Sequence, residues 1–239
     1  MFVFLMIVIA ISAFVQGVTS FGFSLIALPL LALWMPMREI VPLLVICSLV
    51  LNVMMLYSLY RHVAIRLIGM LLVGGVVGIP VGILLLNIVS GYTLKLAAGF
   101  VIVAVSLVLL SGKKFILKSP KRYYLPLGFV AGIMQGSLSL SGPPLVLFLS
   151  NQGVEKQTFR ANLTAFFTAM NLLSLPGFLM SGVLNGPLLS MSLWALPGMI
   201  IGILLGGKVA SWMPEDLFRR VSLVLMCLAG IMTIVTTLT

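Results

Sequence analysis

The stretch QGVTSFGFSLIALP, residues 16–29, interrupts a long apolar segment with glycines, hydroxyls and one amide. The segment runs from Met1 to Pro36, and the chain carries no charge before Arg38. Polar, irregular backbone is costly against lipid, because its N–H and C=O groups have no water to bond. Such a break is therefore expected to be buried in protein or to line an aqueous cavity.

The composition places the chain in a membrane. Of 239 residues, 62% are hydrophobic and 8% are charged, and the mean hydropathy is +1.28, outside the range of soluble domains. The net charge of +10 comes from basic residues in short connections, a pattern of membrane orientation rather than of nucleic-acid binding. The N-terminus lacks the features of a signal peptide, so we expect it to belong to the mature fold. Cys47 and Cys227 lie in apolar spans and are interpreted as packing residues.

Six apolar runs are long enough to cross a bilayer, which takes about 20 helical residues. They are residues 40–60, 67–89, 96–112, 161–181, 184–207 and 217–238. Two further segments, 1–36 and 123–150, are split near their centres into arms of roughly 14 residues. Arms of this length favour a re-entrant or broken helix over a full crossing.

Shifting the sequence against itself indicates a duplication. At an offset of 115, residues 14–30 match 129–145 at seven of 17 positions. This alignment pairs Ser24 with Ser139, together with shared glycine and proline positions. Such residues match by chance less easily than apolar ones, so the alignment predicts two related halves.

The alignment continues with a small insertion. Asn52 pairs with Asn171 at an offset of 119, and GIPVGILL (78–85) pairs with GMIIGILL (198–205) at an offset of 120. The expected organisation is a first transmembrane repeat over 1–112, a basic linker over 113–122, and a second repeat over 123–239.

Lysine and arginine placement decides between two topologies. If each broken segment crosses once, the basic residues divide seven against seven between the two sides. If each segment enters and returns, 12 lie on one side and only Arg38 and Lys95 on the other. The positive-inside rule favours the second arrangement. It puts both termini in the periplasm of a bacterial inner membrane and makes the repeats inverted. The expected fold class is an all-α polytopic membrane protein, each half a broken hairpin plus three transmembrane helices.

The two breaks carry the polar groups expected of a binding site. Inverted repeats with broken helices at matching positions are typical of secondary transporters that bind substrate near the midplane. Helix N-termini and hydroxyl donors favour an oxyanion over a cation. The candidate residues are Thr19, Ser20, Gly22, Ser24, Ser137, Ser139, Ser141 and Gly142. The alternative is that these small residues only let helices approach closely.

Three polar residues within the spans are further candidates. Asn52 and Asn171 occupy equivalent positions and are expected to bond the hairpin tips or the substrate; the alternative is interhelical bonding alone. Arg160 begins a span just after the second break, where it could reach an anion from the cytoplasmic side. Its alternative role is a snorkelling anchor of topology.

No acidic residue lies in the middle of a span, where a proton relay would place it. The four acids are Glu39, Glu155, Glu215 and Asp216. A proton as coupling ion would therefore have to use Glu39 or Glu155, or travel on the substrate anion. No phosphate-binding loop, metal-ligand cluster or activated nucleophile is present. We therefore expect no enzymatic activity, cofactor or metal.

The breaks resemble those of the TauE/SafE sulfite exporter family. The similarity lies in GVTSFGFSLIALPLL, in GFVAGIMQGSLSLSGPPLVLFL, in the FRANLTAFF that follows, and in the duplicated plan, and it covers essentially the whole chain. Many members have more glycines in the first break than the TSFGFS found here. The resemblance implies an inner-membrane carrier that exports sulfur oxyanions such as sulfite, sulfonates or sulfoacetate. By motif position it implies a site at Ser20, Gly22, Ser139 and Gly142, with Arg160 nearby.

The sequence therefore predicts a carrier of small anions, while its oligomeric state, direction and coupling ion stay open. An anion channel is one alternative, because it would share the hairpins but conduct without alternating access. A non-transporting scaffold is the other, and it predicts that polar substitutions at the breaks leave function intact.

Overall fold

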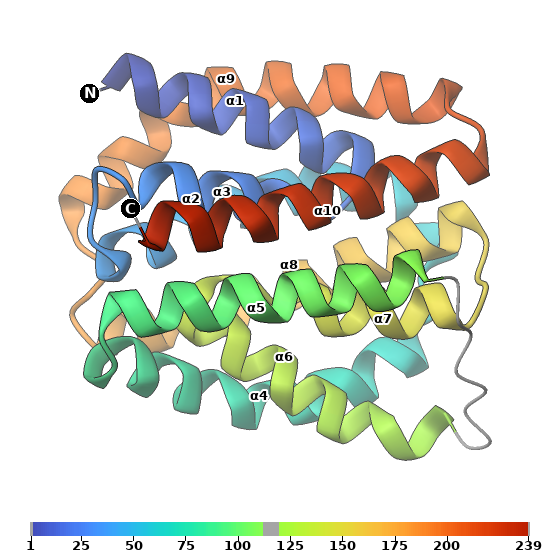
Figure 1. The fold of residues 1–239 in the computed structure, drawn as a ribbon, viewed down its shortest axis with the longest axis horizontal. Coiled ribbons are helices and arrows are strands. Elements are labelled where there is room, and N and C mark those ends of the chain that lie inside the picture. Colours follow the sequence, from blue (N-terminus) through green and yellow to red (C-terminus); the bar gives the residue numbers. More distant parts are fainter. Residues whose placement is uncertain (1, 112–119, 239) are drawn as a thin grey trace.

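The computed structural model describes residues 2–111 and 120–238, and every regular element in these ranges is a helix (Figure 1). The helices are α1 (Phe2–Thr19), α2 (Phe23–Leu31), α3 (Met37–Leu59), η1 (Tyr60–His62), α4 (Ile65–Ile88), α5 (Gly91–Leu110), η2 (Pro120–Tyr123), α6 (Tyr124–Leu138), α7 (Gly142–Asn151), α8 (Lys156–Met180), α9 (Gly186–Trp212) and α10 (Glu215–Leu238). The predicted all-α fold is confirmed. Most of the predicted linker, residues 113–119, lies outside the described residues.

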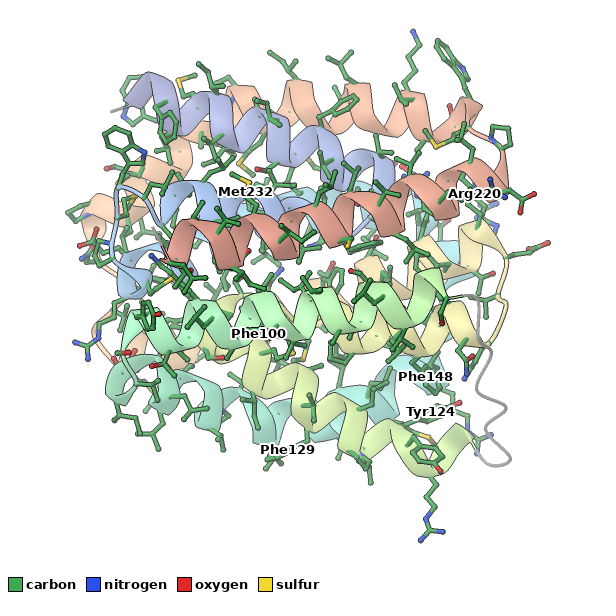
Figure 2. All side chains as sticks on the ribbon, viewed as in Figure 1. Phe100, Tyr124, Phe129, Phe148, Arg220 and Met232 are labelled. Atoms are coloured by element: carbon green, nitrogen blue, oxygen red, sulfur yellow. The ribbon has the colours of Figure 1, made fainter. Side chains whose placement is uncertain are left out.

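Six of these helices, α3, α4, α5, α8, α9 and α10, are long and apolar enough to cross a membrane. The six predicted spans are thereby confirmed in number and place. Side chains such as Phe100 and Phe129 stand on the outside of the bundle (Figure 2), and Phe100 is 62% exposed. An apolar outer surface of this kind suits contact with lipid chains.

The two broken segments form helical hairpins at opposite ends of the bundle. Both chain termini lie at one end, where α1 begins and to which α2 returns; α6 and α7 enter from and return to the other end (Figure 1). The arms contain 18 and nine residues in the first hairpin, and 15 and ten in the second. The predicted arms of about 14 residues are thus right for α6 alone.

Each hairpin packs against a long helix of the other half, so the halves interlock. Helix α4 lies along α6, and α9 lies along α1 (Figure 1). A Cβ added to Gly78 of α4 would lie 3.0 Å from the Cα of Gly132, and one added to Gly202 of α9 would lie 3.0 Å from the Cβ of Ala13. Small residues let the backbones touch, as in tightly packed membrane helices.

These contacts match between the halves in a register that differs from the predicted one. One turn further on, Gly82 meets Gly136, and Gly206 meets Gly17. The broken helices and α3/α8 correspond at an offset of 119, and α4/α5 correspond to α9/α10 at 124. The predicted offsets of 115 and 120 are therefore each wrong by four residues, about one helical turn.

Helices α3 and α8 form the centre of the bundle. In the most apolar 18-residue stretch of each helix, 61% of residues are buried in α3 and 50% in α8, against 25% in α10. The two helices pack against each other and carry the polar residues described below.

Basic side chains bond the carbonyl ends of helices at both ends of the bundle. Lys95 donates to the carbonyl of Ala32 at 3.0 Å, near the chain termini. Lys156 donates at 2.6 Å to the carbonyls of Ala210, in the last turn of α9, and of Met213, which follows it. Cations stabilise helix C-termini because the last carbonyls carry partial negative charge. Arg220 also lies at the end opposite the termini (Figure 2).

Candidate functional site

Each hairpin breaks at a serine in the left-handed backbone conformation. Ser20 has a φ of 70° and Ser139 a φ of 56°, and no other non-glycine residue in the described ranges has a positive φ. This conformation costs a non-glycine residue about 1–2 kcal/mol. The matching geometry makes Ser20 the equivalent of Ser139, so the predicted pairing of Ser24 with Ser139 is wrong.

Two glutamines tie the breaks to the central helices in the same way. The Nε2 atom of Gln16 donates to Oδ1 of Asn52 at 2.9 Å, and Nε2 of Gln135 donates to Oδ1 of Asn171 at 2.7 Å. In both halves the partners are 36 residues apart. The expectation that Asn52 and Asn171 bond the hairpins therefore agrees with the geometry.

The carbonyl oxygens of the same glutamines bond the start of each second arm. Oε1 of Gln16 accepts from the backbone N–H of Phe23 at 3.0 Å. Oε1 of Gln135 accepts from the hydroxyl of Ser141 at 2.8 Å. These bonds satisfy polar groups that the breaks expose, which is necessary inside a membrane protein.

Ser48 of α3 joins the two halves of this network. Its hydroxyl accepts from Nδ2 of Asn52 at 2.9 Å and from Nδ2 of Asn171 at 3.1 Å. All three side chains are buried. The polar groups of both halves therefore form one connected network at the centre of the protein.

The hairpin tips enclose a small polar pocket, called here the central pocket. The hydroxyls of Ser24 and Ser139 lie 3.4 Å apart across it. Its other polar lining residues are Gln16, Ser48, Gln135, Ser141, Gly142 and Asn171, and its aromatic wall is formed by Phe21 and Phe167. Its volume of about 20 Å³ is enough for one water molecule. A larger anion can enter only after the hairpins move apart.

Arg160 lies beside the first break and is 7% exposed. Its Nε donates to the hydroxyl of Ser20 and its Nη2 to the carbonyl of Gly17, both at 2.9 Å. Both partners are neutral, and no ion pair joins Arg160 to a carboxylate among the described side chains. A buried positive charge without a counter-ion is unfavourable, so the guanidinium favours an anion nearby.

A larger cavity opens next to Arg160 at the end of the bundle opposite the chain termini. Its volume is about 400 Å³, in the range of small-molecule sites. We call it the Arg160 cavity; besides Arg160 it is lined by Met54, Met55, Ser58, Leu59, His62, Gln157, Ile203, Leu204 and Gly207.

Five candidate residues line neither cavity. Two of them, Ser20 and Asn52, bond the lining residues Arg160 and Gln16, whereas Thr19, Gly22 and Ser137 lie apart. The hydroxyl of Thr19 donates to the carbonyl of Val15 at 2.9 Å, and that of Ser137 to the carbonyl of Ile133 at 2.7 Å. Gly22 and Thr19 line a narrow apolar crevice. These residues shape the breaks, whereas Ser20, Ser24, Ser139, Ser141, Gly142, Asn52, Asn171 and Arg160 converge on the centre.

Sequence reasoning did not select Gln16, Gln135 or Ser48 for the site. The equal spacing from glutamine to asparagine in the two halves was the available signal for the glutamines. Nothing comparable marks Ser48, because its equivalent in the second half is Phe167. No group of three or more His, Cys, Asp or Glu side chains that could hold a metal occurs in the described part of the chain.

These features define a polytopic α-helical membrane protein with a polar site buried between two broken hairpins. A family model described as sulfite exporter TauE/SafE matches residues 5–233. The chain therefore belongs to the TauE/SafE family, as the resemblance implied, and is a membrane transporter. Searches of curated proteins and of solved structures found no significant match.

Proposed function

We propose that this protein is a secondary transporter of small anions, which exports sulfur oxyanions such as sulfite, sulfonate or sulfoacetate by alternating access. The substrate class comes from the family. The proposed binding residues are those that converge on the centre, together with Thr19, Gly22 and Ser137, which hold the shape of the breaks.

The meeting of the two hairpin tips is the observation that carries this proposal. Ser24 and Ser139 come from hairpins that enter at opposite ends, and their hydroxyls lie 3.4 Å apart. Arg160 supplies a buried positive charge at the edge of the same region. Hydroxyl and amide donors at the tips, with a guanidinium nearby, suit an oxyanion.

Asymmetry between the ends of the bundle supports alternating access. By the offsets of 119 and 124, Leu59 and Gly207 of the Arg160 cavity correspond to Phe178 and Ile83 at the other end. There the larger side chains fill the space: Phe178 is fully buried, and Ile83 packs against Gly177. The described parts of the two ends therefore differ in shape, as expected of a carrier in one of its two states. Inverted repeats can exchange such arrangements during transport.

The proposed orientation places the Arg160 cavity on the cytoplasmic side of a bacterial inner membrane. Both termini lie at the opposite end of the bundle (Figure 1), which the positive-inside rule assigns to the periplasm. A cavity open to the cytoplasm would load an anion for export. The two inverted repeats, 1–112 and 123–239, stay part of this proposal.

Transport by a charge variant at the hairpin tip tests the proposal. Ser139→Asp places a negative charge in the central pocket and should abolish uptake of radiolabelled sulfite into proteoliposomes, while the protein stays folded. The control is Ser190→Asp, because Ser190 is exposed near the start of α9; its uptake should equal that of the wild type. Normal uptake by folded Ser139→Asp protein would remove the tips from the transport path.

A further inference from the structure

We propose that the Arg160 cavity is a second binding station for a small oxyanion, separate from the central pocket and occupied before the hairpins open. This inference rests on the proposed function and assigns binding roles to Ser58, His62 and Gln157. None of these three residues belongs to the hairpins.

Space is the first argument for a separate station. The Arg160 cavity has a volume of about 400 Å³, whereas the central pocket has about 20 Å³. An oxyanion such as sulfite has four heavy atoms and exceeds the room of roughly one water. In this conformation the anion therefore fits beside Arg160 and not between the hairpin tips.

Unused hydrogen-bond donors are the second argument. A guanidinium has five N–H donors, and the bonds of Arg160 to Ser20 and Gly17 use Nε and one N–H of Nη2. Its Nη1 makes no bond to a described residue, although Arg160 is buried and lines the cavity. Planar N–H pairs of arginine recognise oxyanions by two parallel bonds.

Polar side chains that line the cavity add further donors. Ser58 and His62 come from the end of α3 and from η1, and Gln157 lies one turn before Arg160 on α8. No side-chain hydrogen bond joins any of the three to another described residue. Each can donate to an anion through a hydroxyl, an imidazole N–H or an amide.

A buried asparagine holds the backbone beside this cluster. Oδ1 of Asn162 accepts from the backbone N–H of Ala64 at 2.8 Å, and Asn162 is 1% exposed. This bond holds the connection that carries His62 against α8, the helix that carries Arg160. Fixing the backbone beside the cavity lowers the cost of ordering it when an anion binds.

Sulfite titration separates the two stations. Purified, delipidated protein is titrated with sodium sulfite by calorimetry. The double variant His62→Ala/Gln157→Ala should weaken binding about tenfold, because it removes two hydrogen bonds. Gln152→Ala is the matched control, since Gln152 is exposed in the connection after α7 and does not line the cavity. It should leave the affinity unchanged.

Ser139→Asp completes the test, because it alters the central pocket and leaves the Arg160 cavity unchanged. This variant should lose transport yet still bind sulfite, since its change lies outside the Arg160 cavity. Loss of binding in Ser139→Asp with normal binding in His62→Ala/Gln157→Ala would overturn the second station and leave the transporter intact. A wild-type protein that neither binds nor transports sulfite would overturn the proposed function itself. Binding of added phosphatidylglycerol but not of sulfite would assign the cavity to a lipid phosphate and contradict the inference.

Discussion

Replacing each left-handed serine by glycine should shift the stability of the protein in opposite directions. At Ser139 the change relieves about 1–2 kcal/mol of backbone strain. It also adds about 0.5–1 kcal/mol of chain entropy to the unfolded state. The lost hydroxyl makes only a long contact of 3.4 Å with Ser24. Ser139→Gly should therefore stabilise the protein by about 0.5–1 kcal/mol.

At Ser20 the relief of backbone strain is outweighed by the loss of a stronger hydrogen bond. The hydroxyl accepts from Nε of Arg160 at 2.9 Å, and bonds to charged groups contribute about 1.5–3 kcal/mol. Ser20→Gly should therefore destabilise the protein by about 0.5–2.5 kcal/mol. The two variants should differ by about 1.5–3 kcal/mol, the value of the bond to Arg160.

Reversible unfolding in mixed micelles, followed by far-ultraviolet circular dichroism, measures both values. The two serines serve as controls for each other, because they share their backbone conformation and differ in the contact with Arg160. Equal stabilisation of both variants would show that Arg160 does not hold the first break. Equal destabilisation would show that the left-handed conformation is not strained.

Three further predictions concern packing, coupling and topology. Gly78→Leu should destabilise the protein by about 1–3 kcal/mol, because a side chain there would collide with the backbone of α6; Gly69→Leu, which meets open space, should not. Glu39→Gln should leave most sulfite transport intact, since Glu39 lies in the first turn of α3; loss of uphill accumulation would contradict this. A C-terminal reporter active only in the cytoplasm should stay silent, and activity would overturn the hairpin topology.

Helix number and class were predictable from the sequence because both follow from apolar length. A run of about 20 apolar residues has few alternatives to a membrane helix. The interrupted segments could likewise be assigned to broken helices, because the polar residues of the first one, from Gln16 to Ser24, gather near the centre of an otherwise apolar stretch. Arm lengths were less predictable, since both arms are apolar. No sequence signal next to Ser20 or Ser139 marks the serine at which the first arm ends.

The repeat register was one turn in error for a physical reason. A shift of four residues keeps side chains on nearly the same helix face, so apolar helices align almost equally well either way. At an offset of 115 residues 14–30 have seven identities, but at 119 they have five. The smaller set contains Gln16, Gly17 and Ser20. Their matches in the second half share the glutamine–asparagine bond, the close helix packing and the left-handed backbone, respectively.

The candidate site was predictable in its location and not in its chemistry. Breaks in apolar helices mark buried polar space, which located the serines. The bonds of Arg160 to the first break span 140 residues of sequence and depend on how α8 packs beside α1. The equivalent of Arg160 in the first half is the apolar residue Val41. The duplication therefore gave no signal for Arg160.

Counterflow in proteoliposomes tests the central claim most directly. Vesicles loaded with unlabelled sulfite are diluted into a trace of radiolabelled sulfite, with empty liposomes as the control. If the site opens to one side of the membrane at a time, uptake should be faster than in unloaded vesicles. Label should also accumulate transiently above its equilibrium level. Uptake whose rate does not depend on internal sulfite would contradict alternating access and support an anion channel.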